Sequence, residues 1–277
     1  MVQVARPTEV DFLILGAGWT STFLIPLLIS ENISYAATST TGRDGTIKFV
    51  FHPKSDDKEP YTRLPRAKTV LITFPLKGIG QSKRLLDLYS KTHAAMVTNW
   101  IQLGSTGIFT APHWNDHASD YDKQNARAIA EDELLAMGGS VLNLAGLYGG
   151  TREPKNWVIR VAKSKEEVKD KKALHLIHGE DVARAIVAAH RKFYGGERWL
   201  LTDLHVYDWW DLIYVWAEEV EKNNPGQDLQ YRKWVLECME EEKVRALPRE
   251  KESLGRILDS REFWKAVGTW PQKGRVT

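Results

Sequence analysis

The chain of 277 residues is predicted to belong to the α/β class, as a doubly wound parallel sheet with a small, mainly helical C-terminal part. Two observations predict this class. Short apolar runs alternate with helix-like segments through the first half of the chain, as they do where helices join parallel strands. The first apolar run, residues 10–15, breaks at a Gly-x-Gly turn, and a second apolar run follows. Because 43% of the residues are hydrophobic, the chain can bury the core that such a sheet requires.

The turn after the first predicted strand has the composition of a phosphate-binding loop. A helix that starts just after a strand presents backbone N–H groups that have no partner within the helix. Gly16 permits the tight turn, and Gly18 lets a pyrophosphate approach the backbone without a Cβ in the way. The expected dinucleotide contacts in this turn are Gly16, Gly18, Trp19, Thr20 and Ser21. The alternative is a plain strand-to-helix turn that binds nothing.

The segment after the second predicted strand, residues 33–38, indicates which dinucleotide binds. In NAD-binding proteins an Asp or Glu at this point accepts hydrogen bonds from the adenosine ribose. No acid stands there, and the segment offers Thr40, Thr41 and Arg43 instead. Hydroxyl groups and a guanidinium suit a 2′-phosphate dianion, so we expect NADP (NADPH) as the cofactor. The alternative is a solvated polar turn.

The next segments continue the alternation of strands and helices. The predicted strands are residues 46–51, 68–75 and 99–103, and residues 81–92 form a predicted helix. Ligands of open α/β sheets lie beyond the carboxyl ends of the strands. Phe74 and Pro75 are therefore expected to pass beneath the pyrophosphate or the ribose. The pattern as a whole predicts a Rossmann-type core.

Five stretches, in order along the chain, resemble motifs of one family. They are residues 16–19 (GAGW), 103–109 (LGSTGIF), 144–150 (LAGLYGG), 175–186 (HLIHGEDVARAI) and 199–203 (WLLTD). In them the chain resembles the short-chain dehydrogenase/reductase superfamily, in its extended or atypical branch of NAD(P)-dependent epimerase/dehydratase-like proteins. The resemblance implies a nicotinamide cofactor and hydride transfer. It also implies that Ala145, Gly146 and Leu147 pass close to the nicotinamide.

The resemblance implies a catalytic set that this chain carries only in part. In the family, a Ser or Thr after the fifth strand and a Tyr on the next helix bracket the reacting oxygen, and a Lys four residues later lowers the Tyr pKa. Ser105 or Thr106 matches the first role and Tyr121 the second, but an asparagine stands four positions on. A second register places Lys123 and Arg127 in the Tyr and Lys positions and leaves no phenol. Without a neighbouring cation, a tyrosine keeps a pKa near about 10 and is a poor base at neutral pH.

The last third of the chain is expected to form helices rich in tryptophan. Residues 206–220, 229–246 and 251–264 are the predicted helices. Seven of the eleven tryptophans lie in this third: Trp199, Trp209, Trp210, Trp216, Trp234, Trp264 and Trp270. They form either a rigid packing layer or the lining of a substrate pocket. We therefore divide the chain into a dinucleotide-binding core, residues 1–175, and a mixed segment, residues 176–277, that completes the core and forms an aromatic-rich substrate lid.

Composition excludes several other classes of protein. The formal net charge of +2 comes from nearly balanced acids and bases, so no nucleic-acid partner is expected. The single cysteine, Cys238, excludes an internal disulfide framework. No apolar run is long enough to span a bilayer and the N-terminus lacks a secretion pattern, which predicts a cytoplasmic protein with no membrane partner. His113 and His117 have the spacing of helical metal ligands, but Pro112 favours a loop, and we expect no metal.

These observations predict an NADP-dependent oxidoreductase that acts on a small, largely apolar carbonyl, imine or alcohol. Ser105, Thr106 or Tyr121 would polarise the substrate oxygen. Two alternatives stay open: a non-catalytic NADP-binding sensor with a degenerate Tyr/Lys site, and a scaffold that docks through its aromatic C-terminal part. A small-molecule substrate is the expected partner, and the mixed surface pattern leaves a homodimer open.

Overall fold

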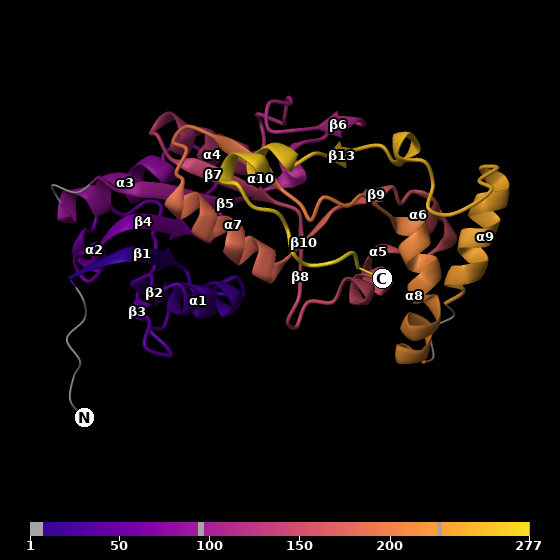
Figure 1. Ribbon diagram of the computed structural model, residues 1–277, viewed down its shortest axis with the longest axis horizontal. Coiled ribbons are helices and arrows are strands. Elements are labelled where there is room, and N and C mark those ends of the chain that lie inside the picture. The colour runs from indigo at the N-terminus through magenta and orange to yellow at the C-terminus, as the bar shows by residue number, and fades with distance from the viewer. Residues whose placement is uncertain (1–7, 94–96, 226–228, 277) are drawn as a thin grey trace.

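The computed structural model describes residues 8–93, 97–225 and 229–276. Seven strands form one parallel sheet in the order β11-β7-β5-β4-β1-β2-β3 (Figure 1). They are β1 (Glu9–Leu15), β2 (Tyr35–Ser39), β3 (Ile47–Lys48), β4 (Arg66–Ile72), β5 (Asn99–Ser105), β7 (Ser140–Leu144) and β11 (Arg198–Leu201). The chain runs outward from β1 in both directions, so the crevice beyond the ends of β1 and β4 is a topological switch point. The predicted doubly wound α/β class is confirmed.

Helices cover both faces of the sheet. One face carries α1 (Ser21–Ser30), α7 (Gly179–Arg191) and α10 (Arg261–Val267), and the other carries α3 (Gln81–Thr92) and α4 (Ala126–Ala136), with the short α2 (Glu59–Thr62) against α3. The side chains of a strand alternate between the two faces. In β1, Phe12 and Ile14 therefore join the core under α1 and α7, whereas Leu13 and Leu15 join the core under α3 and α4. No helix among the described residues is long and apolar enough to cross a bilayer.

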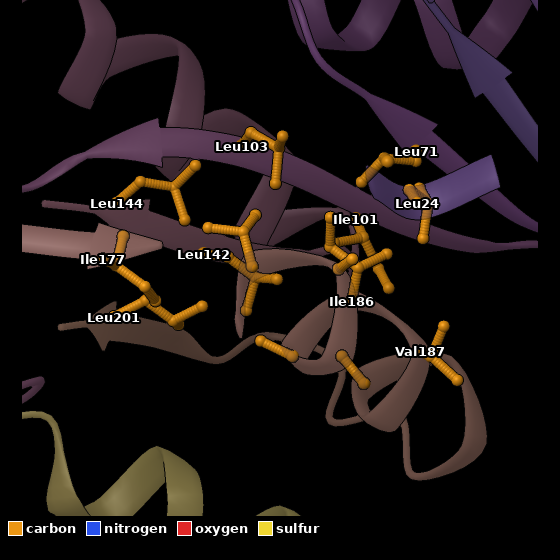
Figure 2. Close-up of a cluster of buried hydrophobic side chains, with 14 of the residues drawn as sticks. Leu24, Leu71, Ile101, Leu103, Leu142, Leu144, Ile177, Ile186, Val187 and Leu201 are labelled. Atoms are coloured by element: carbon orange, nitrogen blue, oxygen red, sulfur yellow. The ribbon is translucent and has the colours of Figure 1, made fainter. Parts of the chain in front are cut away.

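Figure 2 shows the first of these two cores. Leucines from neighbouring strands, including Leu103 of β5 and Leu142 of β7, gather beside Ile186 of α7. The central strands are buried on both faces over most of their length, which explains the continuous apolar runs at residues 12–15 of β1 and 70–72 of β4. In β5 and β7 the buried positions include the polar residues Gln102 and Asn143.

A second, smaller body lies beyond the carboxyl ends of the strands. It contains η2 (Pro154–Trp157), α5 (Val158–Val161), α6 (Lys165–Lys169), α8 (Trp209–Asn223) and α9 (Tyr231–Glu241). Three short strand pairs connect it to the sheet: β8 (Gly146–Tyr148) with β10 (Leu176–His178), β9 (Ala173–Leu174) with β12 (Tyr207–Asp208), and β6 (Trp114–Asn115) with β13 (Ile257–Leu258). In Figure 1, α8 and α9 stand at the opposite end of the molecule from β2 and β3. These helices share a hydrophobic core of their own.

Most of the late tryptophans serve packing. Five of the seven are buried: Trp199, Trp209, Trp210, Trp216 and Trp264. Trp234 is half-buried against the core of the smaller body. Only Trp270, of which 53% is exposed, stands largely in solvent. For the five buried rings, the interpretation as a packing layer is confirmed.

The predicted helix over residues 251–264 is wrong. Its place is taken by η3 (Lys251–Leu254), β13 and α10. Gly255 separates η3 from β13 with a φ of +70°, a left-handed conformation that ends the helical turn. The predicted strand over residues 46–51 is also shorter than expected, because only its first residues pair with β2.

The segment after α10 spans the two bodies. The carboxylate of Asp181, on α7, accepts the backbone N–H of Gln272 at 2.7 Å and of Lys273 at 3.1 Å. Further on, the N–H of Val276 donates to the hydroxyl of Tyr207 at 3.1 Å. In Figure 1 this segment, drawn in yellow, runs from α10 across the centre of the molecule. It ties the helix layer of the sheet to the smaller body.

Candidate functional site

The turn after β1 has a backbone conformation that requires glycine. Gly16 has a φ of +97°, and its N–H donates to the Thr38 hydroxyl at 2.9 Å. The hydroxyl of Thr73, just past β4, donates to the carbonyl of Gly16 at 2.5 Å. A Cβ on Gly16 would lie 2.6 Å from that hydroxyl oxygen, closer than side chains tolerate. The turn is therefore held between the ends of β2 and β4.

The start of α1 presents unpaired amides to open space. Among the described residues, no group accepts the backbone N–H of Trp19 or of Thr20. A Cβ on Gly18 would meet no protein atom within 4 Å, so space for a ligand lies beside these amides. The hydroxyl of Ser21 is buried without a hydrogen-bond partner. Bare N–H groups at the positive end of a helix form an anion site, and these residues fit the pyrophosphate of a dinucleotide.

The loop after β2 places a cation against this turn. The hydroxyl of Ser39 accepts the backbone N–H of Gly42 at 2.9 Å and of Arg43 at 3.2 Å, which fixes the loop. The guanidinium of Arg43 donates to the carbonyl of Ala17 at 3.4 Å, so it lies over the glycine turn. Thr40, Thr41 and Arg43 are all exposed. This edge of the crevice offers hydroxyls and a positive charge to a ligand.

A pocket of about 220 Å³ opens at the carboxyl ends of β5 and β7. It brings together five of the predicted contacts from four separate segments: Thr20, Pro75, Ser105, Ala145 and Leu147. The rest of its lining is mixed and comes from leucine and glycine residues of β5 and β7, from Thr73 and from Arg127. The pocket therefore continues the crevice from the glycine turn toward the predicted nicotinamide position.

Two potential donors line this pocket. Ser105 accepts the backbone N–H of Gly107 on its hydroxyl oxygen at 3.1 Å, which leaves the hydroxyl proton available to a ligand. Arg127 enters from the first turn of α4, and within the described part of the chain nothing pairs with its guanidinium. Arg127 was expected at the site only in the second register of the Tyr/Lys motif. Asn125 is the residue that predicts its position, because asparagine is a typical N-cap residue and places Arg127 in the first turn of a helix. In the structure the Asn125 side chain accepts the N–H of Arg127 at 3.0 Å, at the start of α4.

The structure does not bring Tyr121 to the pocket. The expectation that Tyr121 lies on the helix is wrong, because α4 begins only at Ala126 and Tyr121 lies in the loop before it. Its hydroxyl donates to Asp132 at 2.7 Å, and the guanidinium of Arg198 stacks 4.5 Å from its ring centre. Burial, reinforced by the hydrogen bond to Asp132, raises the pKa of Tyr121. These contacts give the ring a structural role, and the raised pKa leaves the phenol protonated at neutral pH, where it cannot act as a base.

Thr106 is also turned away from the pocket. Its hydroxyl is buried and donates to the carbonyl of Leu144 at 3.3 Å. Of the three predicted catalytic residues, only Ser105 lines the pocket.

The other predicted cofactor contacts lie around the crevice. Phe74 stacks on Phe51 and lies beside the Cα of Gly16. The indole N–H of Trp19 donates to the carbonyl of Gly149 at 3.3 Å, which links the glycine turn to the end of β8. Gly146 is held in the β8–β10 pair.

A buried ionic network supports the pocket from below. Arg198 of β11 forms ion pairs with Glu131 and, at 2.7 Å, with Asp132, both on α4. Asn143 donates to Glu131 at 2.9 Å and to the carbonyl of Ser105 at 3.1 Å. Glu131 is fully buried. The network therefore fixes the end of β5 that carries Ser105, and no sequence pattern revealed it.

Comparisons with known proteins agree with this geometry at the level of the fold. No protein-family profile and no curated protein sequence matches the chain. Among solved structures, a nucleoside-diphosphate-sugar epimerase from Pseudomonas aeruginosa is similar with a TM-score of 0.63 and 14% identity, over 96% of this chain and 93% of that one. A putative NAD-dependent epimerase/dehydratase from Methylobacillus flagellatus has a TM-score of 0.59 and 13% identity, over 93% and 91%.

The UDP-glucose 4-epimerase of Thermus thermophilus, solved in complex with NAD, is similar with a TM-score of 0.58 and 13% identity, over 96% of this chain and 95% of that one. The similarity thus extends over nearly the whole of each chain, the smaller body included. The chain therefore has the fold of the epimerase/dehydratase-like short-chain dehydrogenases/reductases, as its motifs implied.

Proposed function

We propose that this protein is an NADP-dependent oxidoreductase that acts on a small, largely apolar carbonyl, imine or alcohol. One observation carries the proposal: the bare amides of Trp19 and Thr20 open onto a crevice that leads to the pocket of Ser105. Several solved proteins of the same fold support it, since one is described as a reductase and others were solved with NAD. The lining divides between leucine side chains and polar groups such as those of Ser105 and Arg127, which supports a small substrate with an apolar body and one polar oxygen or nitrogen.

Each part of the crevice has a role in holding the dinucleotide. The amides at the start of α1 bind the pyrophosphate, and Thr40, Thr41 and Arg43 bind a 2′-phosphate. Ala145, Gly146 and Leu147 form the surface beside the nicotinamide. When bound, the nicotinamide supplies or accepts the hydride. The protein contributes position and electrostatics to this reaction.

Ser105 and Arg127 act on the substrate oxygen. The Ser105 hydroxyl donates a hydrogen bond to that oxygen, and the Arg127 guanidinium stabilises the negative charge that develops on it. Arginine stays protonated in proteins, so Arg127 acts as a fixed donor. The proton that the oxygen takes up with the hydride comes from solvent water, through the Ser105 hydroxyl, which regains its proton from water. Tyr121 takes no part, because its hydroxyl is occupied by Asp132.

The cofactor preference is tested by titrating the protein with NADPH and NADH, with fluorescence as the readout. Arg43→Ala should weaken the binding of NADPH by about 1.5–3 kcal/mol, or roughly 10–150-fold in affinity, because a charge-assisted hydrogen bond to the 2′-phosphate is lost. NADH affinity should not change. Lys91→Ala, which removes an exposed cation at the far end of α3, is the matched control. If Arg43→Ala lowered the affinity for NADPH and NADH equally, or lowered neither, Arg43 would not contact the 2′-phosphate.

The catalytic assignment is tested by NADPH oxidation across a panel of aldehydes, ketones and imines. Ser105→Ala should lower kcat by about 100–1000-fold, the usual effect of losing a donor to a developing oxyanion. Tyr121→Phe should leave kcat within about twofold. If Tyr121→Phe lowered kcat strongly and Ser105→Ala did not, the tyrosine and not the serine would be the catalytic residue.

A non-catalytic NADP-binding sensor is the second candidate. It is favoured by the lining of the pocket, in which the described residues include no tyrosine. A sensor would bind NADPH tightly and oxidise it with no substrate of the panel, so the same assay separates the two functions.

A further inference from the structure

The tight turn that follows β8 lies against the start of α1. Within this turn the N–H of Gly149 donates to the carbonyl of Arg152 at 2.8 Å, and the N–H of Arg152 donates back to the carbonyl of Gly149 at 3.1 Å. The indole N–H of Trp19 donates to the same Gly149 carbonyl. Gly150 has a φ of +57°, and a Cβ on it would lie 3.4 Å from the ring of Phe23, on α1. The turn is therefore held by its own hydrogen bonds and by contacts with Trp19 and Phe23.

This turn places a guanidinium over the ring of Trp19. The Cζ atom of Arg152 lies 4.3 Å from the ring centre, within the range of a cation–π contact. The backbone N–H of the same Trp19 has no acceptor among the described residues, and we assign it to the pyrophosphate. Since the ring restricts the Arg152 side chain, a positive charge is held within one side-chain length of the proposed anion site.

No carboxylate neutralises this cation in the part of the chain that the structure describes. Arg152 is exposed and forms no ion pair there. The acid next to it in the sequence, Glu153, is paired with Lys155 at 3.1 Å. A guanidinium with free N–H groups can bind two phosphate oxygens at once through charge-assisted hydrogen bonds. Arg152 is therefore available to an anionic ligand.

The charge of a bound dinucleotide calls for such a residue. Each phosphate of the pyrophosphate carries a negative charge, whereas the N-terminus of a helix supplies only about half an elementary charge. Arg43, a second cation at the glycine turn, donates to the carbonyl of Ala17 and is assigned to the 2′-phosphate. The pyrophosphate therefore needs a further cation, and Arg152 is placed to provide it.

We propose that Arg152 is a further dinucleotide-binding residue, whose guanidinium binds the pyrophosphate together with the amide of Trp19. This assignment rests on the proposed function, because it requires a dinucleotide in the crevice. The turn that carries Arg152 leads directly into η2, so the contact joins the smaller body to the cofactor. Because NADPH, NADH and ADP-ribose all contain the pyrophosphate, Arg152 contributes to the binding of each, whereas Arg43 contributes only to that of NADPH.

The test is to titrate the full chain with NADPH, NADH and ADP-ribose, with isothermal titration calorimetry as the readout. Arg152→Met keeps an apolar chain of similar length on the ring of Trp19 but removes the charge. It should lower the affinity for all three ligands by about tenfold or more, because a charge-assisted hydrogen bond to the pyrophosphate is lost. Arg152→Lys keeps the charge but not the planar donor group, so it should lose less affinity than Arg152→Met.

Arg160→Met is the matched control, because it removes an exposed cation of α5 and changes the net charge by the same amount. It should leave the three affinities unchanged. The proposal is overturned if Arg152→Met binds all three ligands as the wild type does, if its loss is confined to NADPH, if ADP-ribose is unaffected, or if Arg160→Met causes the same loss.

The same titrations separate this assignment from the proposed function. If the wild type bound none of the three ligands, the proposed function would fail and the role of Arg152 with it. If the wild type bound them and Arg152→Met bound them equally well, only the role of Arg152 would fail.

Discussion

Replacing Gly18 by alanine should separate cofactor binding from folding. The φ of Gly18 lies outside the positive region, and its new Cβ would meet no protein atom within 4 Å. Alanine at a compatible glycine position reduces the entropy of the unfolded chain, which raises stability by about 0.4–1 kcal/mol. The same methyl group would occupy the space through which a pyrophosphate approaches the bare amides. Loss of one charge-assisted hydrogen bond there corresponds to about 1.5–3 kcal/mol of binding energy, or roughly 10–150-fold in affinity.

Gly16→Ala is the matched control, with the opposite effect on folding. Its φ of +97° is strained for alanine, and its Cβ would lie 2.6 Å from the Thr73 hydroxyl oxygen and 3.2 Å from the ring of Phe74. A strained backbone position costs about 1–3 kcal/mol, so this variant should unfold at lower urea concentration than the wild type.

Urea unfolding and NADPH titration, run on the same preparations, give both quantities. The reasoning predicts a Gly18→Ala protein that is at least as stable as the wild type but binds NADPH weakly. If that variant bound NADPH with wild-type affinity, the pyrophosphate would not lie at this turn. If it unfolded early instead, the open space beside Gly18 would not exist in solution.

Two further predictions concern buried charges. Arg198→Met should lower the free energy of unfolding by about 3–5 kcal/mol, because it leaves the fully buried Glu131 carboxylate unpaired. Arg261→Met removes the exposed partner of Asp259 and should change the free energy of unfolding by less than about 1 kcal/mol. Urea unfolding measures both values, and similar losses for the two variants would contradict the prediction. Burial raises the pKa of Asp203 from its usual 3.8 to about 6. Between these two pH values the folded protein keeps a proton on Asp203 that the unfolded chain has released. The contribution of Asp203 to stability therefore falls as the pH rises through this interval. Asparagine does not titrate, so the Tm of Asp203→Asn should rise relative to that of the wild type as the pH increases from about 4 to 7. A Tm difference that stays constant with pH would refute the raised pKa of Asp203.

The sheet was predictable from the sequence because its strands are buried on both faces. Such strands leave continuous apolar runs, and β1 and β4 were therefore located to within two or three residues of their observed ends. The helix over residues 81–92 matches α3 because its apolar residues follow the helical period. The preference for NADP and the contacts of Arg43 remain predictions.

Other features depend on contacts that no local pattern records. The strands β6 and β13 are two residues long and pair across a separation of about 140 positions, so neither has a recognisable period. The position of Tyr121 was misjudged because the family motif suggested a helix where this chain has a loop that ends at the cap residue Asn125. Burial of Glu131 against Arg198 likewise follows from the packing of α4 on β5 and β7, next to β11, and no local sequence pattern predicts it.

The pairing of Glu131 with Arg198 also constrains how this protein can diverge. The two residues lie 67 positions apart, and either one alone would be a buried charge without a counter-charge. Replacing both by apolar residues of similar volume, however, is often neutral or stabilising. Homologous sequences should therefore show these two columns changing in concert, with single exchanges at either column rare.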